Sequence, residues 1–146
     1  MPIIEVCALP QKPGVDRRAA LATLCTAVAS EFEMPAHAVW GTWQEFAPGD
    51  YLEGADAPSV QPDSTHPPIV RLFAFEGRSP PAIEEMITFV ADTLSRELRM
   101  EEGNVFVLFI EGKSGRVYSG GGIVRKKPAK PHRGAAAGKP RSRKQS

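Results

Sequence analysis

The sequence has little cysteine, with only Cys7 and Cys25 in 146 residues. Two cysteines cannot form a disulfide framework, and no CxxC pair suggests a zinc site. Both lie in apolar-patterned segments, so we predict buried, reduced thiols. No apolar run approaches the roughly 18 residues that a membrane-spanning helix needs. No basic region precedes an apolar stretch at the N-terminus, so we expect no secretory signal and predict a soluble cytoplasmic protein.

Acidic residues are missing from the C-terminal segment. Residues 125–146 hold nine Lys or Arg and no Asp or Glu, although the net charge of the whole chain is only +1. The remaining nine basic and 17 acidic residues give residues 1–124 a charge of about −8. The segment is rich in Pro and Gly without apolar periodicity, so a disordered tail is predicted. No aromatic residues are interleaved for base stacking, which disfavours a nucleic-acid partner, and no membrane partner is expected.

Histidine is also scarce. His37, His66 and His132 are scattered through predicted loops and the tail. No spacing of His, Cys, Asp or Glu resembles a metal site. We therefore predict no metal site.

What the sequence does contain is an internal repeat at an offset of 66 residues. The matches run without a gap from Pro2 on Pro68, through Glu31 on Glu97, to Gly54 on Gly120. Self-similarity of this kind can decide the fold. It predicts one domain, residues 1–124, made of repeat halves 2–60 and 68–124.

Each half has the pattern of a β-α-β unit. Short β-branched and aromatic segments, 2–9 and 69–75, are predicted strands. Apolar stripes at helical spacing predict a first helix from about residue 15 and a second that begins after Ser79 as its N-cap. Second strands are predicted at 39–44 and 105–110, and the latter lacks polar alternation, as a parallel strand covered on both faces would.

Together these elements predict an α/β (α+β) fold: a four-stranded mixed sheet with two helices on one face. The segment 47–67 would link the halves as a surface excursion. Because the second face of the sheet remains apolar, we expect it to be covered by subunit association.

Two motifs carry a resemblance to a known family. The sequence begins Met-Pro-Ile-Ile, and the second half begins with Pro68 and reaches Glu-Gly-Arg-Ser before its helix. With these motifs and the repeat, residues 2 to about 124 resemble the tautomerase superfamily. The second half is similar to a 4-oxalocrotonate tautomerase subunit. The fused length is similar to cis-3-chloroacrylic acid dehalogenase and malonate semialdehyde decarboxylase, and it implies a homotrimer.

The resemblance implies a catalytic role for Pro2 and Arg78. Removal of Met1 would expose the Pro2 nitrogen, and an apolar site lowers the pKa of an amine so that it can act as a general base. The alternative is that Pro2 only starts a strand. Arg78 would bind a substrate carboxylate through its planar guanidinium. Pro68 is internal, and its amide nitrogen cannot be a base.

Five further residues are candidates for substrate binding. Arg71 lies among apolar neighbours, and either a structural ion pair with Glu5 or substrate binding would explain it. Lys12 matches Arg78 in the repeat and is either a surface lysine or a second positive charge. Trp43, Tyr51 and Tyr118 could form an apolar wall that desolvates Pro2, or they could be core or interface aromatics.

The predicted activity is that of a cofactor-independent isomerase, a 1,3-proton transfer between enol and keto forms of a small 2-oxo acid. Phe75 and Ser119 stand where the dehalogenase-type site has an arginine and a glutamate, which argues against hydrolytic dehalogenation. Trp40 and Phe106 stand where an arginine of 4-oxalocrotonate tautomerase would be, which favours an aromatic or monocarboxylate substrate. A Pro2-dependent hydratase, dehalogenase or decarboxylase is the alternative enzyme, and a non-catalytic trimeric binding protein is the alternative outside catalysis.

Overall fold

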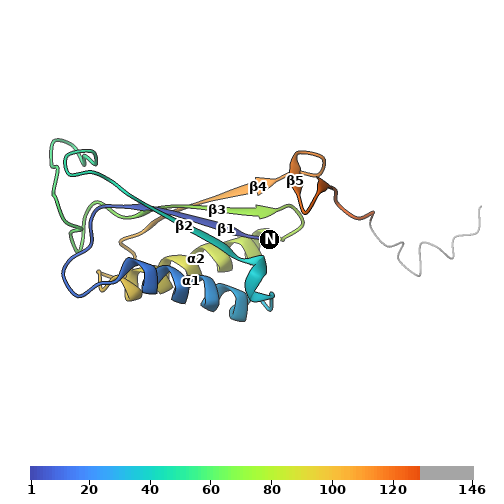
Figure 1. The fold of residues 1–146 in the computed structure, drawn as a ribbon, viewed down its shortest axis with the longest axis horizontal. Helices are drawn as coiled ribbons and strands as arrows, with labels where there is room; N and C mark the ends of the chain where they lie inside the picture. The colour runs from blue at the N-terminus through green and yellow to red at the C-terminus, as the bar shows by residue number, and fades with distance from the viewer. Residues whose placement is uncertain (129–146) are drawn as a thin grey trace, which may run out of the picture.

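One four-stranded sheet, with both helices packed on one of its faces, forms the body of the protein (Figure 1). The computed structural model describes residues 1–128, so most of the predicted tail lies outside the described residues. The strand order is β2-β1-β3-β4. The four strands are β1 (Ile3–Ala8), β2 (Trp40–Glu45), β3 (Ile69–Phe75) and β4 (Phe106–Gly112).

The sheet is mixed, as the sequence predicts. β1 pairs with β2 in parallel, and β3 pairs with β4 in parallel, with Ile3 opposite Trp40 and Ile69 opposite Phe106. β1 and β3 run antiparallel, and Glu5 lies opposite Arg71 at the centre of their pairing. These registers are related by the same offset of 66 residues, so the two halves meet about a pseudo-twofold axis between Glu5 and Arg71.

Side-chain caps decide where the helices begin. α1 (Arg17–Glu31) starts two residues later than expected because the Asp16 side chain accepts hydrogen bonds from the backbone of Arg18 and Ala19. α2 (Pro80–Glu97) starts after Ser79, whose hydroxyl accepts from the backbone of Ala82, as predicted. A short 3-10 turn, η1 (Ala36–Ala38), leads into β2.

The core lies between the sheet and the helices. In β1 and β3 every second residue is buried, and the buried set faces the helices, as the period of a strand requires. Val28 of α1 and Leu94 of α2 hold equivalent positions in the two halves, and both are fully buried. Cys7 and Cys25 are free but only half-buried, which corrects the prediction that both are buried.

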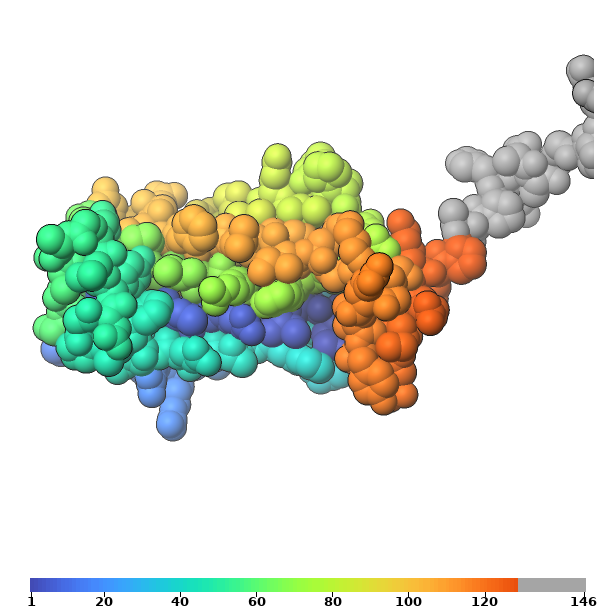
Figure 2. Space-filling view, turned by 90° about the horizontal axis from the view of Figure 1, so that it is seen from above, coloured from blue at the N-terminus to red at the C-terminus, as the bar shows by residue number. Residues whose placement is uncertain are grey.

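Among residues 1–128, no helix lies on the other face of the sheet. Seen from above, the four strands lie side by side across this open face (Figure 2). It presents Trp40, Phe106 and Leu108, which are 47%, 54% and 47% exposed. The expectation that β4 is covered on both faces is therefore wrong within one chain, because only the Val107 side of the strand contacts the core.

The two ends of the sheet are closed by different segments. A hairpin of β5 (Val117–Ser119) and β6 (Gly122–Val124) lies at the end where β1 begins, and the linker 47–67 lies at the opposite end (Figure 1). The linker is more than a surface excursion, because it buries Gln61 and His66.

We predict that Leu94→Ala destabilises the fold by about 2–5 kcal/mol, because it leaves a cavity between α2 and the sheet. Glu85→Ala on the exposed side of the same helix should change the free energy of unfolding by less than about 0.5 kcal/mol. Urea unfolding of both variants beside the wild type measures the difference. Equal effects of the two substitutions would contradict this account of the core.

Candidate active site

A pocket of about 330 Å³ lies at the end of the sheet where β1 begins. Most of its lining is apolar, and it comes from the starts of β1 and β2, the ends of β3 and β4, and the hairpin. The lining residues are Met1, Ile3, Trp40, Phe73, Ala74, Phe75, Gly112, Val117, Tyr118, Ser119 and Val124. A pocket of this size and polarity suits a small ligand with an apolar body.

The N-terminus lies at this pocket. Pro2 is buried, and its carbonyl accepts a hydrogen bond from the backbone of Trp40. Burial lowers the pKa of the Met1 amine, and the positive charge of Arg78 lowers it further. An amine at this position therefore holds less of the protonated form near neutral pH than a free peptide terminus does.

Arg78 reaches the N-terminus because β3 runs antiparallel to β1. The residues that follow β3 therefore lie beside the start of β1. The guanidinium Nη1 of Arg78 donates a hydrogen bond to the Phe75 carbonyl at 3.4 Å, and the side chain is half-buried. Arg78 thus lies near enough to the amine of Met1, the neighbour of Pro2, to lower its pKa. Neither Pro2 nor Arg78 is among the residues that line the pocket.

The hairpin forms one side of the pocket. The hydroxyl of Ser119 lies 3.9 Å from the Met1 sulfur, and Tyr118, 70% exposed, lies beside it at the pocket mouth. Gly112 allows the hairpin to approach β4, since a Cβ there would be 2.9 Å from a methyl carbon of Val117. A larger side chain at residue 112 would push the hairpin away or fill the pocket.

Two of the other predicted binding residues, Lys12 and Arg71, do not line the pocket. Lys12 follows β1 at the opposite end of the sheet, where its ammonium pairs with Asp63 at 2.7 Å and donates to the Arg99 carbonyl. Arg71 is exposed at the centre of the open face, opposite Glu5.

Two of the predicted aromatic residues also lie away from the pocket. Trp43 packs against the core on the helix side of the sheet. Tyr51 lies in the linker, where its hydroxyl donates to the Pro67 carbonyl at 2.7 Å. Only Tyr118 of the three proposed wall residues lines the pocket.

Sequence reasoning did not name the pocket's main lining residues as site residues. Phe73 and Phe75 lie on the same face of β3 as Arg71, and Trp40 pairs with Ile3 at the start of β1. Strand alternation shows which residues of each strand share a face. Without the pairing register, however, it does not show which strand ends meet at the pocket.

Within residues 1–128, no group of three or more His, Cys, Asp or Glu side chains is placed to hold a metal ion. No helix in this range is long and apolar enough to cross a membrane.

Comparison with known proteins gives a consistent fold. No protein-family model and no curated protein sequence matches the chain. Among solved structures, a fused 4-OT that forms a symmetric trimer is similar, with a TM-score of 0.69, 18% sequence identity and coverage of 92% of this chain and 98% of that one. A member of the cis-3-chloroacrylic acid dehalogenase family has a TM-score of 0.66 and 15% identity, covering 85% of this chain and 84% of that one.

Malonate semialdehyde decarboxylase is a third similar structure, with a TM-score of 0.61 and 16% identity over 82% of this chain and 90% of that one. All three belong to the tautomerase superfamily. The four-stranded sheet with two helices on one face is therefore the tautomerase fold.

We predict that Arg78→Met raises the pKa of the terminal amine in chains that retain Met1. A neighbouring positive charge disfavours the ammonium form, so its removal leaves the amine protonated up to a higher pH. The pH dependence of N-terminal acylation measures this, because only the neutral amine reacts. Arg71→Met, at the centre of the open face, is the matched control and should leave the profile in place. An unchanged profile in Arg78→Met would contradict the electrostatic effect of Arg78 on the amine.

Proposed function

We propose that this chain, which has the tautomerase fold, is a cofactor-independent tautomerase that interconverts the enol and keto forms of a small 2-oxo acid. Its general base would be the amine of Pro2, exposed when Met1 is removed. The observation that supports the proposal is the chain's terminal amine at an apolar pocket beside Arg78. Burial and the guanidinium charge both favour the neutral amine, which is the form that can accept a proton.

The reaction would be a 1,3-proton transfer. Neutral Pro2 takes the proton from the enol hydroxyl, and the electron pair moves through the enolate toward carbon. The ammonium then returns the proton to that carbon, which gives the ketone and regenerates the neutral amine. Arg78 would pair with the substrate carboxylate and stabilise the negative charge of the enolate.

The pocket lining favours an aromatic monocarboxylate as substrate. Arg78 supplies one positive charge near the amine, which matches one carboxylate. Trp40, Phe73 and Phe75 supply planar apolar surface for the rest of the molecule. Lys12 pairs with Asp63 at the opposite end of the sheet, so within one chain it offers no second charge to this pocket.

The names of the structural neighbours include a dehalogenase family and a decarboxylase. The fold alone does not choose between these activities and tautomerisation. Ser119 has no ionisable group to activate water beside the amine, and this favours proton transfer over hydrolysis. Hydration and decarboxylation remain the alternative outcomes of the assay below.

We also propose that the chain works as a homotrimer. The described part of the chain leaves the apolar face of the sheet uncovered, and one structural neighbour is a symmetric trimer. Closed rotational symmetry would bury three such faces together.

The first test follows ketonisation of phenylenolpyruvate and 2-hydroxymuconate by ultraviolet absorbance. Pro2→Ala keeps an α-amine but replaces the ring-held secondary amine by a freely rotating primary one. It should lower kcat/KM by up to about 10²- to 10⁴-fold, the usual contribution of a positioned base. Arg78→Ala should lower it by about 10- to 100-fold, the equivalent of one or two charge-assisted hydrogen bonds. Phenylenolpyruvate should be the better substrate because it carries one carboxylate.

The internal repeat provides matched controls for this assay. Pro68→Ala and Lys12→Ala change the counterparts of Pro2 and Arg78 at the other end of the sheet and should leave the rate near the wild-type value. A mass spectrum must show that Met1 has been removed. If the processed wild type does not exceed the buffer rate, simple tautomerisation is excluded and hydration or decarboxylation should be assayed next.

We predict that Leu108→Glu dissociates the trimer, because it places a charge on the open apolar face. Thr88→Glu adds the same charge on the exposed side of α2 and should leave the assembly intact. Light scattering or sedimentation of the purified variants measures the particle mass. A wild-type chain that is a stable monomer would refute the proposed assembly.

A further inference from the structure

The linker contains the counterpart of the β5–β6 hairpin. Glu53 and Asp56 form an isolated antiparallel bridge, and at the offset of 66 they match Ser119 and Gly122, which pair in the hairpin. Gly54 and its match Gly120 have left-handed φ angles of 61° and 62°. The pseudo-twofold axis therefore places a similar hairpin at each end of the sheet, over the start of β1 and over the start of β3.

The two ends differ in the size of the side chains under the hairpin. Gly112, Val117 and Ser119 line the open pocket. Their counterparts are the larger residues Phe46, Tyr51 and Glu53. The rings of Phe46 and Tyr51 pack edge to face, with their centroids 5.1 Å apart. The linker end of the sheet therefore carries large side chains at positions where the candidate active site has small ones.

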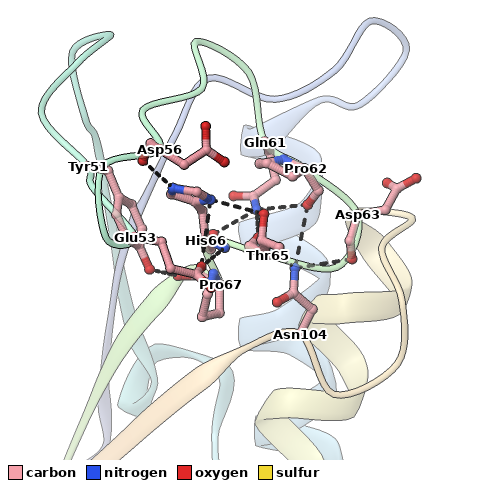
Figure 3. A network of polar contacts seen from close by, with 10 residues as sticks. All are labelled: Tyr51, Glu53, Asp56, Gln61, Pro62, Asp63, Thr65, His66, Pro67 and Asn104. Atoms are coloured by element: carbon pink, nitrogen blue, oxygen red, sulfur yellow. Dashed lines mark hydrogen bonds and ion pairs between the residues drawn. The ribbon is translucent and has the colours of Figure 1, made fainter.

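The imidazole of His66 lies beside these side chains, near Tyr51, Asp56 and Thr65 (Figure 3). His66 is fully buried, and its ring lies against the Tyr51 ring at a centroid distance of 5.2 Å. Its Nε2 lies 2.9 Å from the Asp56 carbonyl, and its Nδ1 lies 3.0 Å from the Thr65 hydroxyl. In the neutral tautomer with the proton on Nε2, Nε2 donates to the Asp56 carbonyl and Nδ1 accepts from the Thr65 hydroxyl. Both ring nitrogens then have hydrogen-bond partners, as the nitrogens of a bound heteroaromatic ligand would.

The backbone around His66 is held from several directions. A Glu53 carboxylate oxygen accepts from the His66 N–H at 2.7 Å, and the Gln61 side chain donates to the His66 carbonyl at 2.8 Å. Asn104, from the second half, donates to the Thr65 carbonyl at 3.0 Å. His66 itself has a φ of 47°, a left-handed conformation that is costly for a residue with a side chain. These hydrogen bonds offset the cost of the left-handed backbone conformation that places the His66 ring in the interior.

We propose that this end of the sheet is a second ligand pocket, with His66 as its built-in occupant. It would accept a small neutral heteroaromatic molecule, such as free imidazole, once the His66 side chain is removed. Consequently, the wild-type chain has an open pocket beneath the β5–β6 hairpin and a filled one beneath the linker, although its two halves have the same fold. This inference does not depend on the activity proposed for Pro2, because the two pockets lie at opposite ends of the sheet.

The test uses His66→Gly, in which glycine fits the left-handed backbone and only the imidazole is lost. Thermal unfolding is measured with increasing concentrations of free imidazole at about pH 8.5, where the added imidazole is neutral. The variant should melt below the wild type, and imidazole should raise its melting temperature saturably, with one molecule bound per chain. Wild type should not respond, because its own His66 occupies the pocket.

The matched control is Leu94→Ala, which opens an apolar cavity without polar partners for a heteroaromatic ring. Benzene, not imidazole, should stabilise that variant. The proposal is overturned if imidazole leaves His66→Gly unchanged, or if it stabilises His66→Gly and Leu94→Ala equally. If His66→Gly does not fold alone, refolding from urea with imidazole should recover the folded protein, and failure to do so would equally overturn the proposal.

Discussion

The antiparallel pairing of β1 with β3 is the constraint on which the site depends. It places Glu5 opposite Arg71 and therefore sets the start of β1 beside the end of β3. The chain terminus at Met1 and Arg78 are 77 positions apart in the sequence, yet this register brings the guanidinium close enough to lower the pKa of the terminal amine. A register slip of one residue would turn every side chain of β3 to the other face and move the apolar residues of the pocket into the helix layer.

The pocket combines low polarity with one positive charge. An apolar lining disfavours any charged group, and this acts on the ammonium form of the terminal amine in the same direction as the guanidinium does. Arg78 keeps a contact with the Phe75 carbonyl and is half-buried, so water still reaches it in part. The same guanidinium can therefore depress the pKa of the amine and remain available to a carboxylate. Within the proposed mechanism, these two effects serve successive steps, because the base must be neutral before the enolate needs stabilising.

Local signals in the sequence predicted the elements well, whereas the contents of the site depended on distant contacts. The Ser79 cap, the two prolines after it and the alternation of β3 are properties of a few adjacent residues, and the structure matches them. Trp43 lies three residues after Trp40, so strand alternation sends it to the opposite face, but only the pairing with β1 shows which face is which. Similarly, Lys12 matches Arg78 in the repeat. Because a twofold axis relates the two halves, this match places Lys12 at the opposite end of the sheet from Arg78. The burial of His66 had no periodic signal, because it depends on the closure of an irregular linker.

Duplication gives the two ends of the sheet the same backbone but does not oblige them to keep the same side chains. At one end small residues leave a pocket, and the chain terminus supplies an amine that can titrate. At the other end the chain continues through Pro67 into β3, so the equivalent nitrogen is an amide without basic character. An open pocket at that end would expose apolar surface to water, and without a basic nitrogen it could not transfer a proton. Filling it with Phe46, Tyr51 and the His66 ring instead converts that end into packed structure that stabilises the linker. Within the proposed mechanism, the difference between the two ends follows from chain connectivity, because Pro68 is internal and only Pro2 can become a terminus.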